Sequence, residues 1–99
     1  MYQIYMTEEF RKLKNKLDGS EQQWISKIMD QLQVNPSGKI LCFSWFREKK
    51  YLNKRLYYLV DEKRRNILFI AYESKKDQRS VIRNVVQKRE EFLEKLRKF

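Results

Sequence analysis

The segment from Lys54 to Lys76 constrains the fold most, because it reads as two apolar strands joined by a charged turn. The first strand is KRLYYLV, the second is ILFIAY, and DEKRRN lies between them, a pattern that predicts an antiparallel hairpin. Its outer ends carry two basic pairs, Lys54 with Arg55 and Lys75 with Lys76. Because these ends are neighbours in an antiparallel hairpin, we expect the basic pairs to share one rim of the sheet, where an anionic ligand would bind.

The chain is short and strongly basic. Its 99 residues contain 23 Lys and Arg against 13 Asp and Glu, which gives a net charge of +10. A chain of this length builds one hydrophobic core, so we expect a single domain over residues 1–99. A surface with this much positive charge attracts polyanions, of which nucleic acid is the commonest in a cell. A need for solubility or an acidic protein partner would also explain the charge.

Histidine is absent, and Cys42 is the only cysteine. The commonest general acid–base residue and the usual zinc ligands are therefore missing, so we expect neither a metal nor another cofactor. A single cysteine forms no intramolecular disulfide, and the apolar neighbours of Cys42 predict a core position. Neither a signal peptide nor an apolar run of membrane-spanning length is visible, which favours a cytoplasmic protein without membrane contact.

The N-terminal part of the chain predicts a strand followed by a helix. Residues 2–6 are rich in β-branched and aromatic side chains, which favour a strand. Thr7 is a candidate N-cap for the first helix, whose apolar residues recur at helical spacing. Asp18 and Gly19 are expected to end this helix, with Gly19 in the left-handed conformation that suits a C-terminus.

A second helix is expected to follow directly. Ser20 and Gln23 form a capping-box pattern at its start, and the Asn-Pro-Ser-Gly turn at residues 35–38 would end it. Residues 39–46 (KILCFSWF) then predict one strand with two largely apolar faces. Such a strand is either covered on both sides or keeps one face for a partner. Residues 47–53 (REKKYLN) are expected to form a basic loop.

The C-terminal part predicts one long helix with Asp77 as its N-cap, because apolar residues keep helical spacing from Val81 to Phe99. A helix of about twenty residues spans about 30 Å, which is longer than a small sheet requires. Its distal apolar residues, from Phe92 onward, therefore predict a second covered surface or a homodimer. The element order is β-α-α-β-β-β-α, an α+β fold in which the last three strands form an antiparallel meander.

With these elements in this order, the chain resembles the RelE/ParE superfamily of small bacterial and archaeal toxins. The segment Lys54–Asp77 is similar to that family's central R-x-x-Y strand, hairpin and basic loop, and the NPSGK turn at residues 35–39 precedes the meander as in the family. The resemblance covers nearly the whole chain. It implies a toxin of a type II toxin–antitoxin system, with an acidic amphipathic antitoxin as its partner.

The resemblance implies one of two activities. The RelE branch implies an endoribonuclease that enters the ribosomal A site and cuts messenger RNA, which inhibits translation. There the RNA 2′-hydroxyl attacks the adjacent phosphate and leaves a 2′,3′-cyclic phosphate, so the nucleophile belongs to the RNA and no histidine is needed. The ParE branch, which blocks DNA gyrase, implies instead a non-catalytic protein that binds nucleic acid or gyrase through its basic rim.

The resemblance also implies roles for single residues. Arg55 matches the arginine that grips the scissile phosphate. Lys75 and Lys76 match the basic loop, where one of them would stabilise the pentavalent intermediate or protonate the leaving oxygen. The residues expected to contact RNA are Arg47, Lys49, Lys50, Lys54, Tyr72 and Arg79. Tyr72 would stack on a base, because residues 78–84 lack the tyrosine that many ribosome-dependent members carry there.

Simpler explanations exist for the same residues. Arg55 would equally be explained as a solvent-facing strand residue or as the partner of Asp61 or Glu62, and the two lysines as part of a solvated loop. Those lysines nevertheless precede a predicted helix N-terminus, whose free N–H groups attract anions. Among the carboxylates near the cations, only Glu48 and Glu73 are left as conceivable general bases.

Overall fold

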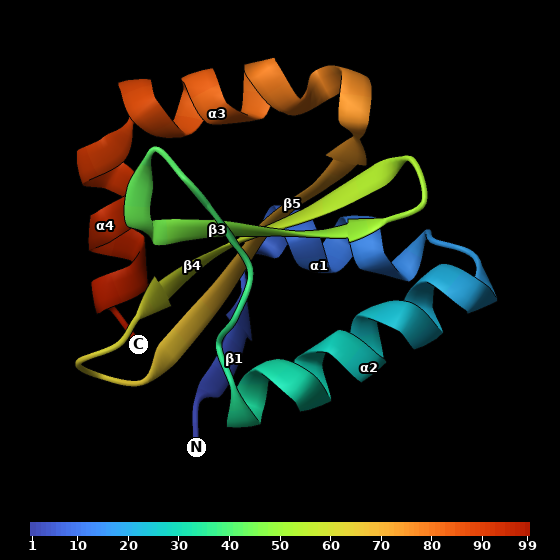
Figure 1. Cartoon of the computed structure of the whole chain (residues 1–99), viewed down its shortest axis with the longest axis horizontal. Coiled ribbons are helices and arrows are strands. Elements are labelled where there is room, and N and C mark those ends of the chain that lie inside the picture. The colour runs from blue at the N-terminus through green and yellow to red at the C-terminus, as the bar shows by residue number, and fades with distance from the viewer.

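Five strands form the centre of the computed structural model, which describes residues 1–99 (Figure 1). The elements are β1 (Gln3–Met6), α1 (Glu8–Asn15), α2 (Gly19–Val34), β2 (Lys39–Leu41), β3 (Phe43–Tyr51), β4 (Lys54–Asp61), β5 (Asn66–Ser74), the 3₁₀ turn η1 (Lys75–Asp77), α3 (Gln78–Gln87) and α4 (Arg89–Arg97). The α+β class expected from the sequence is confirmed. None of the helices has the length and apolar character needed to cross a membrane.

The predicted hairpin forms the interior of the sheet, whose strand order is β1-β5-β4-β3-β2. Strands β3, β4 and β5 pair as the expected antiparallel meander, whereas β1 pairs parallel to β5. Every residue of β4 from Arg55 to Val60 is buried, because helices cover both faces of this strand. One irregularity interrupts the hairpin: Tyr57 lies opposite Ala71 but Tyr58 lies opposite Phe69, so Ile70 is an extra residue in β5.

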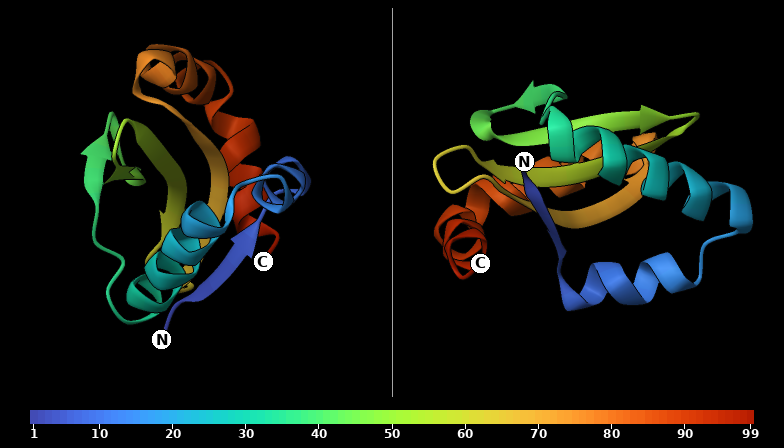
Figure 2. Two further views of the ribbon diagram at one scale, coloured as in Figure 1. Left: turned by 90° about the vertical axis from the view of Figure 1, so that its right-hand side faces the viewer. Right: turned by 90° about the horizontal axis from the view of Figure 1, so that it is seen from below.

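The chain has two hydrophobic cores and not the single core expected from its length, because helices cover both faces of the sheet: one core lies under α1 and α2 and the other under α3 and α4 (Figure 2). Tyr58 and Phe69 belong to the first core, together with Phe10 of α1. Tyr57 belongs to the second core, together with Val85 of α3. Consecutive side chains of a strand point to opposite faces, so the two adjacent tyrosines of β4 anchor different helical layers.

The junction between the first two helices differs from the expectation. Gly19 begins α2 and does not provide a left-handed end for α1. Asp18 is the N-cap of α2: its Oδ1 accepts hydrogen bonds from the Glu21 amide at 2.8 Å and from the Ser20 hydroxyl at 2.9 Å. These two bonds hold the pKa of the Asp18 carboxyl below its usual value. Asp18 therefore takes the capping position predicted for Ser20, since a charged acceptor caps a helix at least as well as a hydroxyl.

The region of residues 39–53 also folds differently from the prediction of one strand and one basic loop. Strand β2 ends at Leu41, and Cys42 adopts a φ of 56° that turns the chain back, so that β2 and β3 pair antiparallel. Strand β3 then continues to Tyr51, and the residues expected in a loop lie on a strand beside β4. Cys42 itself is exposed and is not a core residue.

The predicted long C-terminal helix is two helices, α3 and α4, which meet at Lys88. Figure 1 shows the chain turning at this point, so that α4 descends along the sheet. Val85 and Leu96 consequently enter the same core, and the ring of Phe99 stacks on Tyr5 with the two centroids 4.3 Å apart. Distal apolar residues of this helical segment thus cover a second surface within the chain, which was one of the two alternatives expected for them.

A tyrosine hydroxyl and an arginine fix the loop before β2. The Tyr58 hydroxyl donates a hydrogen bond to the Ser37 carbonyl, and Arg47 Nη1 donates one to the Pro36 carbonyl. Gly38 lies between these contacts and β2 with a φ of 153°, and a Cβ atom added to it would overlap the Tyr58 hydroxyl. A side chain at this position is therefore excluded both by backbone conformation and by space.

We expect Gly38→Ala to lower the free energy of unfolding by about 2–4 kcal/mol, because the new methyl group displaces Tyr58 and strains the backbone. Urea unfolding followed by circular dichroism measures the change. Gly19→Ala is the control, because a Cβ there meets no atom within 4 Å, and its stability should change by less than about 0.5 kcal/mol. Equal stabilities of the two variants would contradict this account of the loop.

Candidate functional site

The outer end of the β4–β5 hairpin brings together cations that are far apart in the sequence. Arg55 of β4 lies opposite Glu73 of β5 on one side and opposite Lys50 of β3 on the other. The Lys75 amide donates a hydrogen bond to the Asn53 carbonyl at 2.7 Å, which holds the start of η1 against the turn between β3 and β4. The prediction that the two basic ends of the hairpin are neighbours is confirmed.

Strand alternation divides the polar residues of this end between the two faces of the sheet. The set that faces α3 is called the α3-side cluster and consists of Glu48, Lys50, Arg55, Tyr57 and Glu73. The set that faces α2 consists of Arg47, Lys49, Lys54 and Tyr72. Only the α3-side cluster shares its face with the start of α3, so the residues predicted to bind RNA do not form one surface.

Arg55 is more buried than a rim residue was expected to be, with 7% of its surface exposed. Its Nη1 donates to the Leu52 carbonyl at 3.3 Å and to the Lys54 carbonyl at 2.9 Å. It forms no ion pair with Asp61 or Glu62, which was the simpler explanation of this arginine. Backbone carbonyls therefore orient the guanidinium while leaving its charge free of a carboxylate, as binding of an anion would require.

Glu48 is a buried carboxylate, 5% exposed, without an ion-pair partner. Both of its oxygens accept hydrogen bonds from Gln78 Nε2, at 3.1 and 2.9 Å. Tyr57 lies directly opposite Glu48 on β4, and its buried hydroxyl has no hydrogen-bond partner. Burial, and then the nearby charge of Glu48, raises the pKa of Tyr57 to about 12. The α3-side cluster therefore holds a carboxylate and a neutral phenol in a poorly solvated place beside Arg55.

The remaining cations of this end are exposed. Lys75 and Lys76 lie in η1 and Arg79 lies in the first turn of α3, and none of them forms an ion pair. Asp77 stands at the N-cap position of α3 as predicted, but its side chain makes no capping hydrogen bond, because η1 leads directly into the helix. The basic turn and the start of α3 thus present positive charge to solvent beside the α3-side cluster.

Two of the residues predicted to contact RNA hold the loop before β2. Arg47 is largely buried, and its Nη2 lies 2.7 Å from Glu62 Oε1 in an ion pair. Lys49 donates from Nζ to the Ser37 hydroxyl at 3.1 Å. Arg47 therefore connects β3 to the β4–β5 turn, and both side chains point away from Arg55.

Two further residues of that prediction pack against α2. Lys54 Nζ lies 3.1 Å from Glu21 Oε2 and 5.2 Å from the centre of the Tyr72 ring. Tyr72 is 3% exposed and packs near Trp24, with the ring centroids 6.3 Å apart. Burial raises the pKa of Tyr72 above its usual value. Its ring offers no free face to a nucleobase in this structure.

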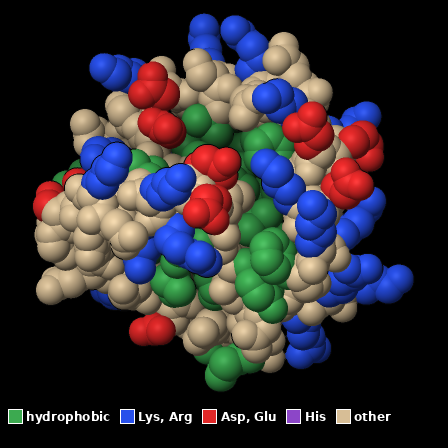
Figure 3. All heavy atoms as spheres, turned by 180° about the vertical axis from the view of Figure 1, so that it is seen from behind, with side chains coloured by type: hydrophobic (Ala, Val, Ile, Leu, Met, Phe, Trp, Pro, Cys, Tyr) green, Lys and Arg blue, Asp and Glu red, His purple; other side chains and the backbone are tan.

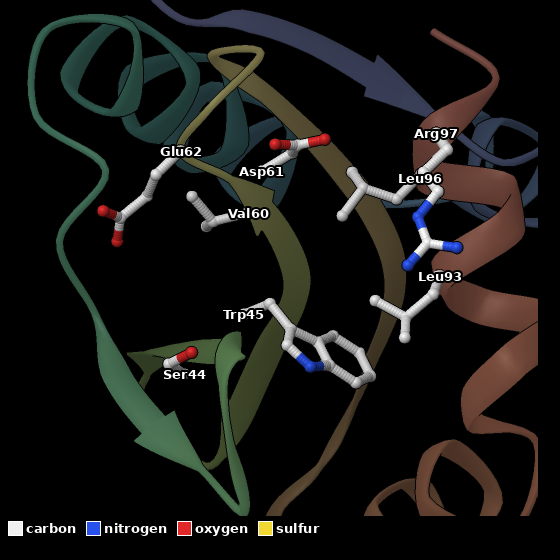
Figure 4. A pocket seen from close by; sticks show the side chains of 8 residues that line it. All are labelled: Ser44, Trp45, Val60, Asp61, Glu62, Leu93, Leu96 and Arg97. Carbon is white, nitrogen blue, oxygen red and sulfur yellow. The ribbon is translucent and has the colours of Figure 1, made fainter.

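A pocket of about 520 Å³ lies at the other end of β4 (Figure 4). Its lining residues are Ser44, Trp45, Val60, Asp61, Glu62, Leu93, Leu96 and Arg97. Asp61 lies six positions after Arg55 on β4, a distance of about 20 Å in a strand. With an apolar wall and two carboxylates, this pocket does not suit a polyanion and is separate from the α3-side cluster.

Positive charge extends beyond the hairpin end. On the side of the molecule shown in Figure 3, Lys and Arg side chains are spread over much of the surface, with acidic side chains between them. The net charge of +10 therefore attracts polyanions to the whole molecule. Oriented donors such as Arg55 are what distinguish the α3-side cluster from this general field.

No protein-family model matches the chain, and no curated protein sequence matches it. Solved structures of RelE toxins do match. A free Escherichia coli RelE mutant with two arginines replaced has a TM-score of 0.71 and 18% identity, over 89% of this chain and 96% of that chain. The toxin of the intact E. coli RelBE toxin–antitoxin complex has a TM-score of 0.67 and 18% identity, over 75% and 96% of the two chains. The RelBE2 toxin–antitoxin complex from Mycobacterium tuberculosis gives 0.61 and 17%, over 74% and 96%.

The match extends over most of both chains, although the identity is low. The common architecture is β1, two N-terminal helices, strands β2 to β5 and C-terminal helices, although one C-terminal helix was expected where the structure has two. This chain therefore has the RelE fold.

Proposed function

We propose that this chain is the toxin of a type II toxin–antitoxin system, acting in the cytoplasm as a ribosome-dependent endoribonuclease on messenger RNA. The observation that carries the proposal is that two charged groups without ion-pair partners lie on the same face of the sheet. These are the Arg55 guanidinium and the Glu48 carboxylate. They are diagonal neighbours on adjacent strands, so their Cα atoms lie about 7–8 Å apart, which suits contacts to one phosphodiester unit. The fold that the chain shares with RelE toxins supports the same conclusion.

The proposed mechanism uses the RNA as its own nucleophile. Glu48 accepts the proton of the 2′-hydroxyl while the 2′-oxygen forms a bond to the adjacent phosphorus. Arg55 donates to the non-bridging oxygens and stabilises the charge of the pentavalent intermediate. The bond from phosphorus to the 5′-oxygen then breaks, and Lys75 or Lys76 protonates the leaving oxygen. The products are a 2′,3′-cyclic phosphate and a free 5′-hydroxyl.

One observation favours a second candidate function. Tyr72, the residue expected to replace the missing tyrosine of residues 78–84, is buried. If no aromatic ring stacks on the substrate, the same rim would bind nucleic acid or DNA gyrase without cutting RNA. This alternative predicts binding that weakens steeply as salt is raised, with no change in RNA length.

We also propose an antitoxin as the partner of this chain. The E. coli and M. tuberculosis structures that share its fold were solved as complexes of a toxin with its antitoxin. With a net charge of +10, an acidic peptide would complement its surface.

We expect Arg55→Met to reduce cleavage by about 100-fold or more, because the phosphate loses an oriented donor. The protein is added to a translating extract with a defined messenger RNA, and the 3′ ends of the fragments are mapped. Two carbonyls also lose their donor, at a cost of about 1–2 kcal/mol, so thermal unfolding must show that the variant is folded at the assay temperature. Arg65→Met is the control, because Arg65 is exposed at the opposite end of the same hairpin.

Cyclic-phosphate ends that require ribosomes and are lost in Arg55→Met would support the proposal. Full cleavage by folded Arg55→Met would contradict the assignment of Arg55. Intact RNA with the unsubstituted protein, together with gyrase inhibition, would favour the non-catalytic alternative.

We expect Glu48→Gln to slow single-turnover cleavage by about 10²–10⁴-fold, since the isosteric amide accepts no proton. Binding to programmed ribosomes should change little. Glu73→Gln is the matched control, because Glu73 lies on the same face but is exposed. A large loss in Glu73→Gln and none in Glu48→Gln would transfer the role of base to Glu73.

A further inference from the structure

Gln78 makes the only hydrogen bonds that reach the Glu48 carboxylate. A carboxylate only accepts, so the amide of Gln78 must present its nitrogen, and the orientation of this side chain follows from its partner. The Gln78 backbone amide donates to the carbonyl of Lys75, the first residue of η1, and Val85, further along α3, is fully buried. Gln78 therefore approaches Glu48 from an element that is fixed at both ends.

None of the charged groups around Glu48 forms an ion pair with it, and its hydrogen-bond partner is the neutral amide of Gln78. Lys50 lies on the same strand and face, Arg55 lies on β4, and Glu73 lies on β5. None of these side chains is bonded to Glu48, and neither is the Tyr57 hydroxyl opposite it. Of the charged side chains in the turn before α3, Lys75, Lys76 and Asp77, none is paired with it either.

A neutral donor has a consequence that a cation would not have. An ion pair between Arg55 and Glu48 would orient both groups but would also neutralise both, and neither would then be free for substrate. The amide of Gln78 engages both carboxylate oxygens without a charge. A carboxylate has about four lone-pair positions, so those not directed at Gln78 remain available for a substrate proton.

We propose that Gln78 is the positioning residue of this site: its amide orients Glu48 for proton abstraction while leaving Arg55 free to bind the phosphate. The inference rests on the proposed ribonuclease function. Gln78 does not touch the reacting atoms, so its loss should slow the chemical step without weakening the association of the protein with its substrate.

The test measures cleavage of messenger RNA on programmed ribosomes by two variants of Gln78. Gln78→Leu removes the donor and should lower kcat by about 10–100-fold, with KM within twofold, because a misplaced catalytic group loses rate and not affinity. Gln78→Glu should lower kcat at least as much, since it sets a second carboxylate against Glu48. A glutamate in the first turn also suits the helix dipole, so this second variant retains the fold.

Gln87→Leu is the matched control, because Gln87 is an exposed glutamine at the other end of the same helix. Its kcat and KM should equal those of the unsubstituted protein. Urea unfolding of Gln78→Leu, Glu48→Gln and the double variant should also show coupled stabilities, as expected for two side chains in contact.

The outcomes separate this inference from the function on which it rests. If the unsubstituted protein leaves RNA intact, both are overturned. If it cleaves RNA and Glu48→Gln is inactive, but Gln78→Leu cleaves as fast or faster, only the role of Gln78 is overturned; a faster rate would mean that Gln78 covers the base. A rise in KM without a change in kcat would mean that Gln78 contacts the substrate. If the changes in unfolding free energy of the two single variants add up to that of the double variant, Gln78 and Glu48 are not in contact.

Discussion

The pairing of β4 with β5 is the interaction on which the rest of the structure depends. Because β4 is buried along almost its whole length, its backbone groups must be satisfied by neighbouring strands, and its side chains supply both cores. The same pairing joins Arg55 to the end of β5 and so to the basic turn. Stability and the candidate site are therefore products of a single hairpin.

Much of this arrangement follows from sequence pattern. The alternating and continuous apolar runs identify the hairpin, and the basic pairs at its ends identify the rim. Two interruptions could not be predicted from the pattern. The strand of residues 39–46 is broken at Cys42, where a non-glycine residue adopts a left-handed conformation. The C-terminal helix is broken at Lys88, where no proline or glycine ends it. At both breaks the apolar residues on either side enter the same core, Leu41 and Phe43 around Cys42 and Val85 and Phe92 around Lys88, and such tertiary packing overrides local preference.

The division of the polar residues between the two faces of the sheet could not be predicted from the sequence either. With residues 47–53 expected in a loop, neighbouring basic residues such as Lys49 and Lys50 were interchangeable. The strand register separates them: on the α2 side Arg47 and Lys54 have carboxylate partners, whereas Arg55 and Lys50 on the α3 side have none. The paired cations Arg47 and Lys54 and the unpaired cations Lys50 and Arg55 thus lie on opposite faces of one sheet. The contact between Gln78 and Glu48 joins residues 30 positions apart and left no signal in the sequence.

The extra residue in β5 has an effect out of proportion to its size. Before Ile70, odd-numbered residues of β5 face α2, as Ile67 and Phe69 do; after it, the even-numbered Tyr72 faces α2 and Glu73 faces α3. The bulge therefore exchanges the residues that face α2 with those that face α3, just before the candidate site. A gap-free alignment of this strand with a relative that lacks the bulge would assign every later position to the wrong face. Alignments with other proteins of this fold must therefore match the strand pairing on both sides of Ile70, and not the number of residues in the strand.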